Sequence, residues 1–556
     1  MAIKELLKSR IKNRADLASF KRKIAKKYKI PCPSNIQLLK VYHELIEKKR
    51  LRRLEEIENL LKTRPIRSLS GIVNISVLTK PYPCPGKCIY CPAEKGMPKS
   101  YLSGEPAAER AKKLKFNPYL QAKKRIEMLK NEGHPTAKID LRIIGGTWSY
   151  YPRYYQIWFI KRCFEACNEF NGPKKSKTKN RTSIDGSEGE EGDEVLFTYQ
   201  KSKLQIKIQK LKKAQKLNET AKNRIIGISI ETRPNFINER GGKFMRELGI
   251  TRVELGVQSI YDDVLKINLR GHGVKETILA TKLLKNCGFK ICYQMMPNLP
   301  GSNLKKDEKM FEEIFSNPDF QPDYLKIYPC ALVREAPLYK WYQQGKYKPY
   351  AKDELISLVK KIKRKIPYYV RIQRITRDIP SQYIIAGGAK ISNLRQIVQG
   401  KIKKEDWKCK CVRCREIREK YEPWEKFYLF RQDYEASGGK EIFLSFENKN
   451  RSKLFSFLRL RIPSQYFEKK NHFLKVLNET AIIREVQTFG EVVPIGKRKI
   501  APQHRGLGKK LIKEAEKVTK NEFGLKKMAI IAGVGVRDYF KKMGYKLKDT
   551  YMVRKI

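Results

Sequence analysis

The sequence predicts an α/β protein: a partial barrel of βα units, preceded by a small basic helical module and followed by a smaller α/β domain. Three observations support this fold class. From residue 70 onward, apolar runs typical of strands alternate with helical segments, which indicates a parallel sheet. The chain has 556 residues, of which 41% are hydrophobic, enough for two or three domains with a core. A cysteine run follows the first strand, where parallel barrels carry their active sites.

Residues 1–66 are expected to form the helical module. The first 68 residues contain 20 Lys and Arg against 7 Asp and Glu. Leu, Ile and Val recur between the charges at helical spacing, as in 36–46. The clusters Lys21–Lys23 and Lys48–Arg50 favour contact with nucleic acid, although an ordinary solvated helix face has the same pattern.

Residues 67–385 are expected to form the barrel. The segment 172–194 is rich in Gly, Ser, Lys and Glu and lacks apolar periodicity, so it is predicted to be a flexible surface insertion. The runs predicted to be barrel strands are Ile72–Thr79, Ile139–Gly145, Ile225–Ile230, Val253–Val257, Phe289–Met296, Tyr324–Tyr328 and Tyr369–Ile375.

A linker at 386–423 leads to the last predicted domain, 424–556. Its central feature is a turn with Gln503, Gly506 and Gly508 that opens a helix. Such a turn can cradle a phosphate, because glycine permits close approach and the free N–H groups of the helix start face the anion. The alternative is a glycine-capped core helix. Flanking elements are predicted at Ile482–Phe489, Glu491–Ile495, Met528–Ala532 and Gly533–Tyr545.

The cysteine run has the spacing C-x3-C-x2-C, with Cys84, Cys88 and Cys91. Three thiolates so close can bind three irons of a 4Fe-4S cluster and leave the fourth iron open. The alternative is a zinc knuckle, but no further Cys or His lies within about forty residues downstream. The run resembles the signature of the radical S-adenosylmethionine superfamily. That resemblance implies that S-adenosylmethionine binds the open iron and is cleaved to a 5'-deoxyadenosyl radical.

The order of elements in 424–556 resembles the Gcn5-related N-acetyltransferase fold, in which the glycine turn holds the pyrophosphate of acetyl-CoA. A radical domain ahead of such a domain resembles the catalytic-subunit family of Elongator, in its single-chain archaeal form. The stretches that carry this resemblance are 65–71, 100–106, 145–148, 231–234, 254–259, 325–329, 377–380 and 533–537.

The family resemblance implies an activity that neither domain predicts alone. It implies a tRNA uridine(34) acetyltransferase that forms 5-carboxymethyluridine at the wobble position. Acetyl-CoA would supply the two carbons, and a 5'-deoxyadenosyl radical would activate them for attack on C5 of the base, a poor site for polar chemistry. The implied partners are the tRNA anticodon stem-loop and an electron donor.

The resemblance also implies roles for particular residues. Lys326 and Tyr539 are the catalytic candidates. Those implied to bind S-adenosylmethionine or substrate in the barrel are Gly145, Gly146, Thr147, Glu231, Arg233, Glu254, Gln258 and Lys326. Those implied to bind acetyl-CoA are Lys138, Glu485, Val486, Gln487, Thr488, Gln503, Gly506, Leu507, Gly508, Lys509, Tyr539 and Phe540. Phe540 stands where relatives have a second tyrosine, so it lacks the hydroxyl that Tyr539 retains.

A second cysteine cluster, Cys409, Cys411 and Cys414, lies in the linker. The spacing C-x-C-x2-C suits thiolate ligation, and the resemblance implies a structural zinc site. The fourth ligand is open between Cys32, His43 and water. The alternative is a set of buried structural cysteines.

The charge of the chain points to a polyanionic partner. It has 120 Lys and Arg against 58 Asp and Glu, a formal net charge of +62. Nucleic acid is the first candidate, and a thermophile or high-salt composition would explain only part of so one-sided an excess. The clustered cysteines, the charged N-terminus and the lack of a run of about 20 apolar residues predict a cytoplasmic protein without a membrane span.

Two other functions fit parts of the sequence. A protein lysine acetyltransferase with a structural iron–sulfur cluster is the first alternative, but it would not need the polar residues at the strand ends. A radical methylthiotransferase of tRNA is the second, but that class carries a second cluster and no acetyltransferase domain.

Overall fold

A computed structural model describes the structure of residues 2–9, 11, 13–48, 50–64, 68–170, 193–418, 424–490 and 506–556. Most of the insertion predicted at 172–194, the strand predicted at Glu491–Ile495 and the cofactor candidate Gln503 lie outside the described residues. Within the described residues, no helix is long and apolar enough to cross a membrane.

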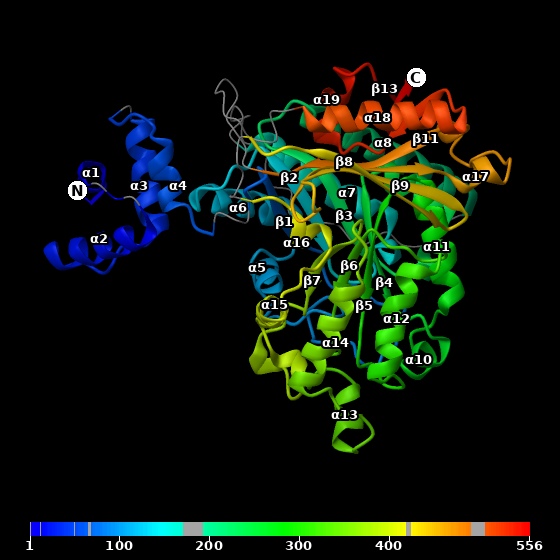
Figure 1. Cartoon of the computed structure of the whole chain (residues 1–556), viewed down its shortest axis with the longest axis horizontal. Coiled ribbons are helices and arrows are strands. Elements are labelled where there is room, and N and C mark those ends of the chain that lie inside the picture. The colour runs from blue at the N-terminus through cyan, green and yellow to red at the C-terminus, as the bar shows by residue number, and fades with distance from the viewer. Residues whose placement is uncertain are drawn as a thin grey trace.

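The N-terminal region consists of four short helices that stand apart from the rest of the molecule (Figure 1). They are α1 (Ala2–Lys8), α2 (Arg14–Lys27), α3 (Asn35–Glu47) and α4 (Glu55–Leu61). A capping box between Ser34 and Gln37 begins α3. Leu38, Leu39 and Tyr42 of α3 lie in a small core of their own. The helices predicted here are therefore present, and they expose most of their lysines and arginines.

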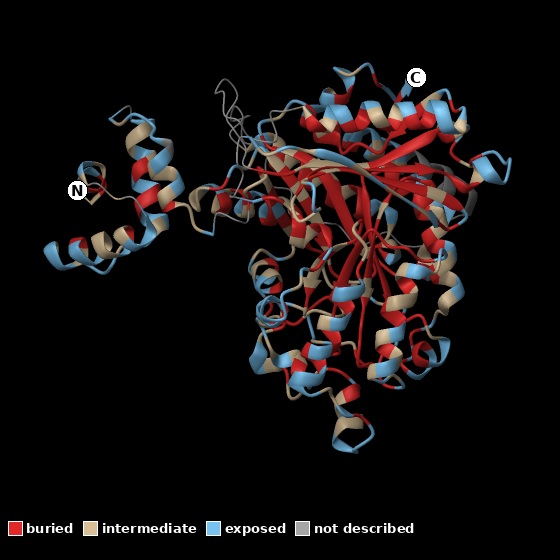
Figure 2. Ribbon diagram, in the orientation of Figure 1, coloured by how far each residue is buried: buried red, intermediate tan, exposed pale blue. Residues whose placement is uncertain are grey.

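All seven strands predicted for the barrel are present and form one parallel sheet in sequence order. They are β1 (Ile72–Leu78), β2 (Lys138–Ile144), β3 (Arg224–Thr232), β4 (Arg252–Gln258), β5 (Lys290–Met295), β6 (Tyr324–Ile327) and β7 (Arg371–Ile375). No pairing joins β1 to β7, so the barrel is open along one side. Every residue of β4 is buried, as expected for a central parallel strand (Figure 2).

Helices cover the outside of this half-barrel and complete its βα units. They are α5 (Pro106–Lys113), α6 (Pro118–Asn131), α7 (Arg153–Glu169), α8 (Asp193–Asn218), α9 (Glu239–Glu247), α10 (Asp262–Ile267), α11 (Val274–Asn286), α12 (Leu304–Ser316), α13 (Leu338–Gln343) and α14 (Lys352–Lys365). Two further helices, α15 (Leu394–Lys404) and α16 (Val412–Arg415), belong to the segment that follows β7.

The C-terminal region is a separate seven-stranded mixed sheet in the order β13-β14-β12-β11-β10-β9-β8. Its strands are β8 (Tyr428–Ala436), β9 (Gly439–Glu447), β10 (Leu454–Ile462), β11 (Ala481–Thr488), β12 (Lys527–Ile530), β13 (Lys546–Lys548) and β14 (Tyr551–Lys555). Its helices are α17 (Ser464–Phe467), α18 (Leu507–Phe523) and α19 (Arg537–Lys541). The sequence predicted β11, β12, α18 and the α19 region, but not β8–β10, β13 or β14.

The mixed sheet packs across the N-terminal ends of the barrel strands. A Cβ atom on Gly533 would lie 1.9 Å from the carbonyl oxygen of Ile226, near the start of β3. A Cβ on Gly535 would lie 2.6 Å from Cβ of Arg224. Two glycines of the 533–537 stretch are therefore required because the two sheets meet there backbone against backbone.

A fully buried group of charges holds the same junction. Nη1 of Arg484, in β11, donates to Oδ2 of Asp323 at 2.8 Å, and Asp323 directly precedes β6. Nη2 of Arg484 donates to Oε2 of Glu441, in β9, at 2.9 Å. Lys285 of α11 lies 3.7 Å from Glu441. Burial raises the pKa of Asp323, but the charges of Arg484 and Lys285 outweigh it and hold that pKa below its ordinary value. Burial lowers the pKa of Lys285 to about 8.

We predict that Gly533→Ala destabilises the protein, because the new methyl group meets backbone that cannot move without separating the two sheets. The free energy of unfolding should fall by about 3 kcal/mol, at the upper end of overpacking costs. The matched control is Gly400→Ala in α15, where a Cβ meets nothing within 4 Å. The free energy of unfolding of this control should rise by about 0.5–1 kcal/mol, because alanine is less unfavourable than glycine inside a helix. Denaturant unfolding measures both, and equal stability of the two variants would contradict the packing.

Candidate functional site

The cysteine run forms the loop after β1, on the C-terminal side of the barrel. Cys88 is buried, and Cys84 and Cys91 are half-buried. Four thiolate sulfurs that bind one zinc ion tetrahedrally lie about 3.8 Å from one another, because each Zn–S bond is about 2.3 Å long. In the described part of the chain, these three sulfurs do not form a group within 4.8 Å of one another. A 4Fe-4S cluster does not require such close convergence, because each thiolate binds a different iron.

Two arginines surround this loop. Nη1 of Arg270 donates to Sγ of Cys88 at 3.3 Å. A Cβ on Gly86 would lie 2.0 Å from Nη1 of Arg233, so glycine is needed for the loop to pass this guanidinium. Burial raises the pKa of Cys88, but the charges of Arg270 and Arg233 and hydrogen bonds outweigh it and lower that pKa. The positive groups would also offset the negative charge of thiolates bound to iron.

The predicted Gly145–Thr147 segment lies beside the same loop. Oγ1 of Thr147 is 3.9 Å from Sγ of Cys84. Gly145 has φ +144°, and a Cβ there would lie 1.9 Å from Oγ1 of Thr79. The turn after β2 therefore needs glycine, and it brings Thr147 to Cys84.

The predicted polar residues of the strands converge inside the barrel. Glu231 of β3 accepts hydrogen bonds at Oε1 from Nζ of Lys326, at 3.1 Å, and from Nε2 of Gln294, at 3.0 Å. Lys326 also forms an ion pair with Glu254 of β4. Tyr101 donates to Oε2 of Glu231 at 2.8 Å. The sequence missed Tyr101 and Gln294; Tyr101 lies in the 100–106 family stretch, whereas nothing in the sequence marks Gln294.

This polar group keeps Lys326 charged. Burial lowers the pKa of Lys326, but the charge of Glu254, with Tyr328 and Glu231, raises it well above its ordinary value. Burial raises the pKa of Glu254, and the charges of Lys326 and Arg252 lower it overall. Lys326 is therefore a donor of hydrogen bonds and not a base at neutral pH.

Unpaired polar atoms mark the mouth of the barrel. Oε1 of Gln258 and Nη1 of Arg233 are buried and find no hydrogen-bond partner among the described residues. Gln258 ends β4 with φ +72°, a left-handed conformation that a non-glycine residue seldom adopts. Buried polar groups are normally paired, so these two atoms are suited to receive a ligand.

The second candidate site lies where β11 and β12 separate. These strands pair only from Ala481 to Ile483 of β11, although β11 continues to Thr488. The backbone of Glu485–Thr488 on that side is therefore not paired with β12. The free N–H groups at the start of α18 lie beside it, because a Cβ on Gly508 would be 3.5 Å from Oγ1 of Thr488.

The two aromatic candidates have different environments. The hydroxyl of Tyr539 lies 3.7 Å from the position of a Cβ on Gly508, and its ring is 41% exposed. Burial raises the pKa of Tyr539, so the phenol stays protonated. Phe540 is buried in the core of the mixed sheet, where it contacts the cavity described next. Gly506 has φ +68°, as expected for a turn that needs glycine.

A cavity of about 850 Å³ leads from the second candidate site along the N-terminal ends of the barrel strands, and we call it the seam cavity. It follows the open side of the half-barrel and reaches Ile483–Gln487 of β11. Lys138 begins β2 beside Arg224 at the end of the barrel nearest the mixed sheet. Arginines dominate the walls of the seam cavity: Arg64, Arg110, Arg125, Arg142, Arg252, Arg371, Arg374, Arg413, Arg418 and Arg484.

Glu485 connects the second site to the barrel. Its Oε2 accepts from Nε of Arg459 at 3.0 Å, and its Oε1 accepts from the hydroxyl of Tyr324 in β6. The backbone of this residue faces the gap between strands while its side chain holds the junction. Sequence patterns alone could not predict this second role.

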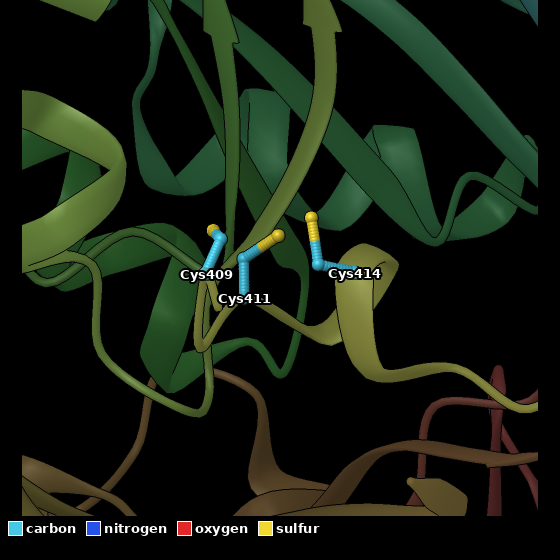
Figure 3. Close-up of side chains that lie close together, drawn as sticks. All are labelled: Cys409, Cys411 and Cys414. Atoms are coloured by element: carbon cyan, nitrogen blue, oxygen red, sulfur yellow. The ribbon is translucent and has the colours of Figure 1, made fainter. Parts of the chain in front are cut away.

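The linker cysteines form a third site. The sulfurs of Cys409, Cys411 and Cys414 lie within 4.8 Å of one another and point together (Figure 3). Nζ of Lys363 donates to Sγ of Cys414 at 3.5 Å. No further Cys, His, Asp or Glu of the described chain joins the group, and His43 instead lies 3.2 Å from Glu58 in the N-terminal helices. The arrangement suits one tetrahedral metal ion with an open position.

Comparisons with known proteins agree with this geometry. Residues 183–314 match the radical SAM superfamily, and residues 322–404 match the radical SAM C-terminal domain. The tRNA uridine(34) acetyltransferase of Methanocaldococcus infernus is 41% identical over 539 residues, covering 94% of this chain and 92% of that protein. Human Elongator complex protein 3 is 35% identical to this chain, and the match covers 89% of this chain and 86% of the human protein.

A solved structure is also similar. The archaeal Methanocaldococcus infernus Elp3 with an N-terminal deletion has a TM-score of 0.71 and 39% identity, and the match covers 88% of this chain and 100% of that one. Membership of the radical SAM superfamily implies a 4Fe-4S cluster and S-adenosylmethionine. This chain belongs to the family of tRNA uridine(34) acetyltransferases and Elongator complex protein 3, and it is a radical S-adenosylmethionine enzyme.

Proposed function

We propose that this enzyme forms 5-carboxymethyluridine at the wobble position of tRNA, with acetyl-CoA as the source of the two added carbons. The observation that carries the proposal is the presence of two sites in one chain: the cysteine loop at the mouth of the barrel, and the gap between β11 and β12, which opens into the arginine-lined seam cavity. We also propose the domain limits 1–66, 67–385, 386–423 and 424–556.

The barrel residues are proposed to hold the cluster and S-adenosylmethionine. Cys84, Cys88 and Cys91 would bind three irons, and the bound pair supplies a 5'-deoxyadenosyl radical. Gly145–Thr147 would accept the methionine end, since they lie beside Cys84. Gln258 and Arg233 would pair their unsatisfied atoms with the ligand. Lys326, held by Glu231 and Glu254, would donate hydrogen bonds to the substrate without removing a proton.

The mixed sheet is proposed to be a Gcn5-related N-acetyltransferase domain that binds acetyl-CoA. The backbone of Glu485–Thr488 would pair with the pantetheine arm, and the start of α18 at Gly506–Lys509 would receive the pyrophosphate. Tyr539 would hold a proton beside the thioester, because its hydroxyl lies on the same side as Gly508. Lys138, whose pKa is lowered by burial and by Arg224, would contact the cofactor from the barrel.

The positive seam cavity favours RNA over a protein substrate. Arginines outnumber carboxylates in its walls even without the buried Arg484, so the cavity attracts phosphates, and recognition of a single-stranded loop allows one base to be splayed into a pocket. A lysine side chain of a protein substrate would be repelled by the same charges. The geometry therefore favours tRNA modification over the alternative of a protein lysine acetyltransferase.

The linker triad is proposed to bind a structural zinc ion. Three converging sulfurs supply three of its ligands, and the donor from Lys363 would offset their negative charge. Cys32 and His43 do not join the group, which leaves water as the fourth ligand among the three candidates.

The central test is the modification itself. Anaerobic protein is incubated with tRNA, S-adenosylmethionine and acetyl-CoA labelled in both acetyl carbons, and wobble nucleosides are read by mass spectrometry. Cys88→Ala should abolish the labelled carboxymethyl product and the absorption near about 400 nm of iron–thiolate charge transfer. Cys32→Ala, which changes an exposed cysteine, should retain both. Product from the Cys88 variant would rule out the radical route.

The acetyl-CoA site is tested by Gly508→Glu. The new carboxylate would occupy the start of α18, where the pyrophosphate is proposed to lie, so affinity should fall more than about tenfold, or about 1.4 kcal/mol. Calorimetric titration with acetyl-CoA measures the change, and the cluster absorption serves as the control. Unchanged affinity would place acetyl-CoA elsewhere.

Binding of tRNA is tested by reversing charges on α2. Arg22, Lys23 and Lys26 are exposed there, so the triple change to Glu should weaken binding and lower the salt slope of log K by about 2–3. The same change at Lys305, Lys309 and Lys352 on α12 and α14 is the matched control. Affinity for acetyl-CoA should be unaffected in both. Equal loss in the two triple variants would contradict a special role for the N-terminal helices.

A further inference from the structure

The outer wall of the cysteine loop lies at the protein surface. Along residues 83–88 the chain alternates: Pro83, Pro85 and Lys87 are exposed, whereas Gly86 and Cys88 are buried. Each exposed position is therefore next in sequence to a cluster ligand or to the glycine between two of them. The loop presents its sulfurs inward and a short strip of apolar and basic side chains outward.

The end of α10 extends this strip. A hollow of about 560 Å³ lies between the cysteine loop and α10, and Pro85, Lys87, Lys266 and Leu269 are among its walls. We call these four residues the loop–α10 face. Leu269 is 52% exposed and borders the same hollow. The face thus combines two apolar side chains with two lysines, a mixture that protein-docking sites use.

One layer of protein separates this face from the cluster ligands. Arg270 follows Leu269 directly, and its guanidinium donates to Sγ of Cys88 at 3.3 Å. The amide of Ile89 donates to the carbonyl of Asn268 at 3.3 Å. An electron that arrives at the face would reach the cluster through a few bonded atoms. Since electron transfer through protein slows steeply with distance, a surface next to the cluster ligands is well placed to receive the electron.

The charge of the face favours an acidic partner. The ammonium groups of Lys87 and Lys266 are exposed and have no carboxylate partner among the described residues. Asp262, the carboxylate beside the hollow, accepts the amide of Val274 at 2.8 Å and so begins α11. Asp263 forms an ion pair with Lys306. Asp262 keeps its negative charge, but Lys87, Lys266 and Arg270 outnumber it in the walls of the hollow, so the face is positive.

We propose that the loop–α10 face docks a small acidic protein that carries a low-potential one-electron centre, either a flavin or an iron–sulfur cluster. The donor loses one electron and the cluster held by Cys84, Cys88 and Cys91 gains it, with no transfer of atoms. Such encounters use small interfaces and are steered by charge, so their rates depend strongly on salt. The proposal rests on the cluster of the proposed function.

The test compares two reductants of the same cluster. The full-length protein with its reconstituted cluster is mixed anaerobically with reduced flavodoxin, and bleaching of the cluster absorption is followed by stopped flow. The double variant Lys87→Glu, Lys266→Glu should be reduced at least about tenfold more slowly at low salt, with a smaller difference at high salt. Dithionite, a small reductant that needs no docking, should reduce the variant and the wild type at rates within about twofold.

Two further variants sharpen the result. Leu269→Asp should slow reduction by flavodoxin in the same way, since it removes the exposed apolar contact. Lys517→Glu, Lys520→Glu on α18 carries the same charge change on the mixed sheet, at the opposite end of the barrel from the loop, and should behave as wild type.

The outcomes separate the docking face from the cluster. If dithionite fails to reduce the wild type, the cluster assignment and the docking proposal both fall. If dithionite works but the double variant accepts electrons from reduced flavodoxin and from reduced ferredoxin at the wild-type rate, the docking face alone is wrong. If the double variant loses affinity for tRNA but its cluster is reduced at the wild-type rate, the two lysines bind RNA, and the docking proposal is wrong as well.

Discussion

The buried charges at the junction fix the relation of the two sheets. Arg484 and Glu441 from the mixed sheet and Asp323 and Lys285 from the barrel are almost completely excluded from solvent. Buried charges are tolerated when they are paired. Removal of one partner leaves the other as an unpaired buried charge, which strongly destabilises the fold. A sliding or tilting of one sheet would break several of these contacts together. The network therefore favours one orientation of the mixed sheet on the barrel.

That orientation places the two candidate sites at opposite ends of the barrel. Barrels of this kind work at the C-terminal ends of their strands, yet the mixed sheet covers the N-terminal ends. A closed barrel would separate the two sites by its packed interior. Here β1 and β7 do not pair, and the seam cavity runs from the gap between β11 and β12 along residues of both edge strands, such as Asn74 and Arg374. The second site therefore opens toward the unpaired edges of the barrel.

The sequence predicted the elements whose residues share one environment. Each barrel strand carries buried apolar residues, continuous in β4 and alternating in β2, so its existence was evident, and the cysteine and glycine motifs lay where the parallel topology requires them. The strands β8 and β10 were missed because their composition misleads: β8 is largely solvent-accessible, and β10 contains the buried arginines Arg459 and Arg461. Gln294 was missed for a related reason, since only the convergence of strands brings it to Glu231.

The buried arginines also bear on how the net charge is interpreted. Arg459, Arg461 and Arg484 serve the interior, so they cannot contribute to a surface that binds RNA. Their partners Asp323 and Glu441 are buried with them, however, and leave the surface at the same time. Internal pairing therefore removes charges of both signs, and it consumes little of the surplus of +62. The excess must reside on the surface and in the seam cavity. Self-repulsion of that size destabilises a compact chain, so a polyanionic partner remains the physical explanation for it.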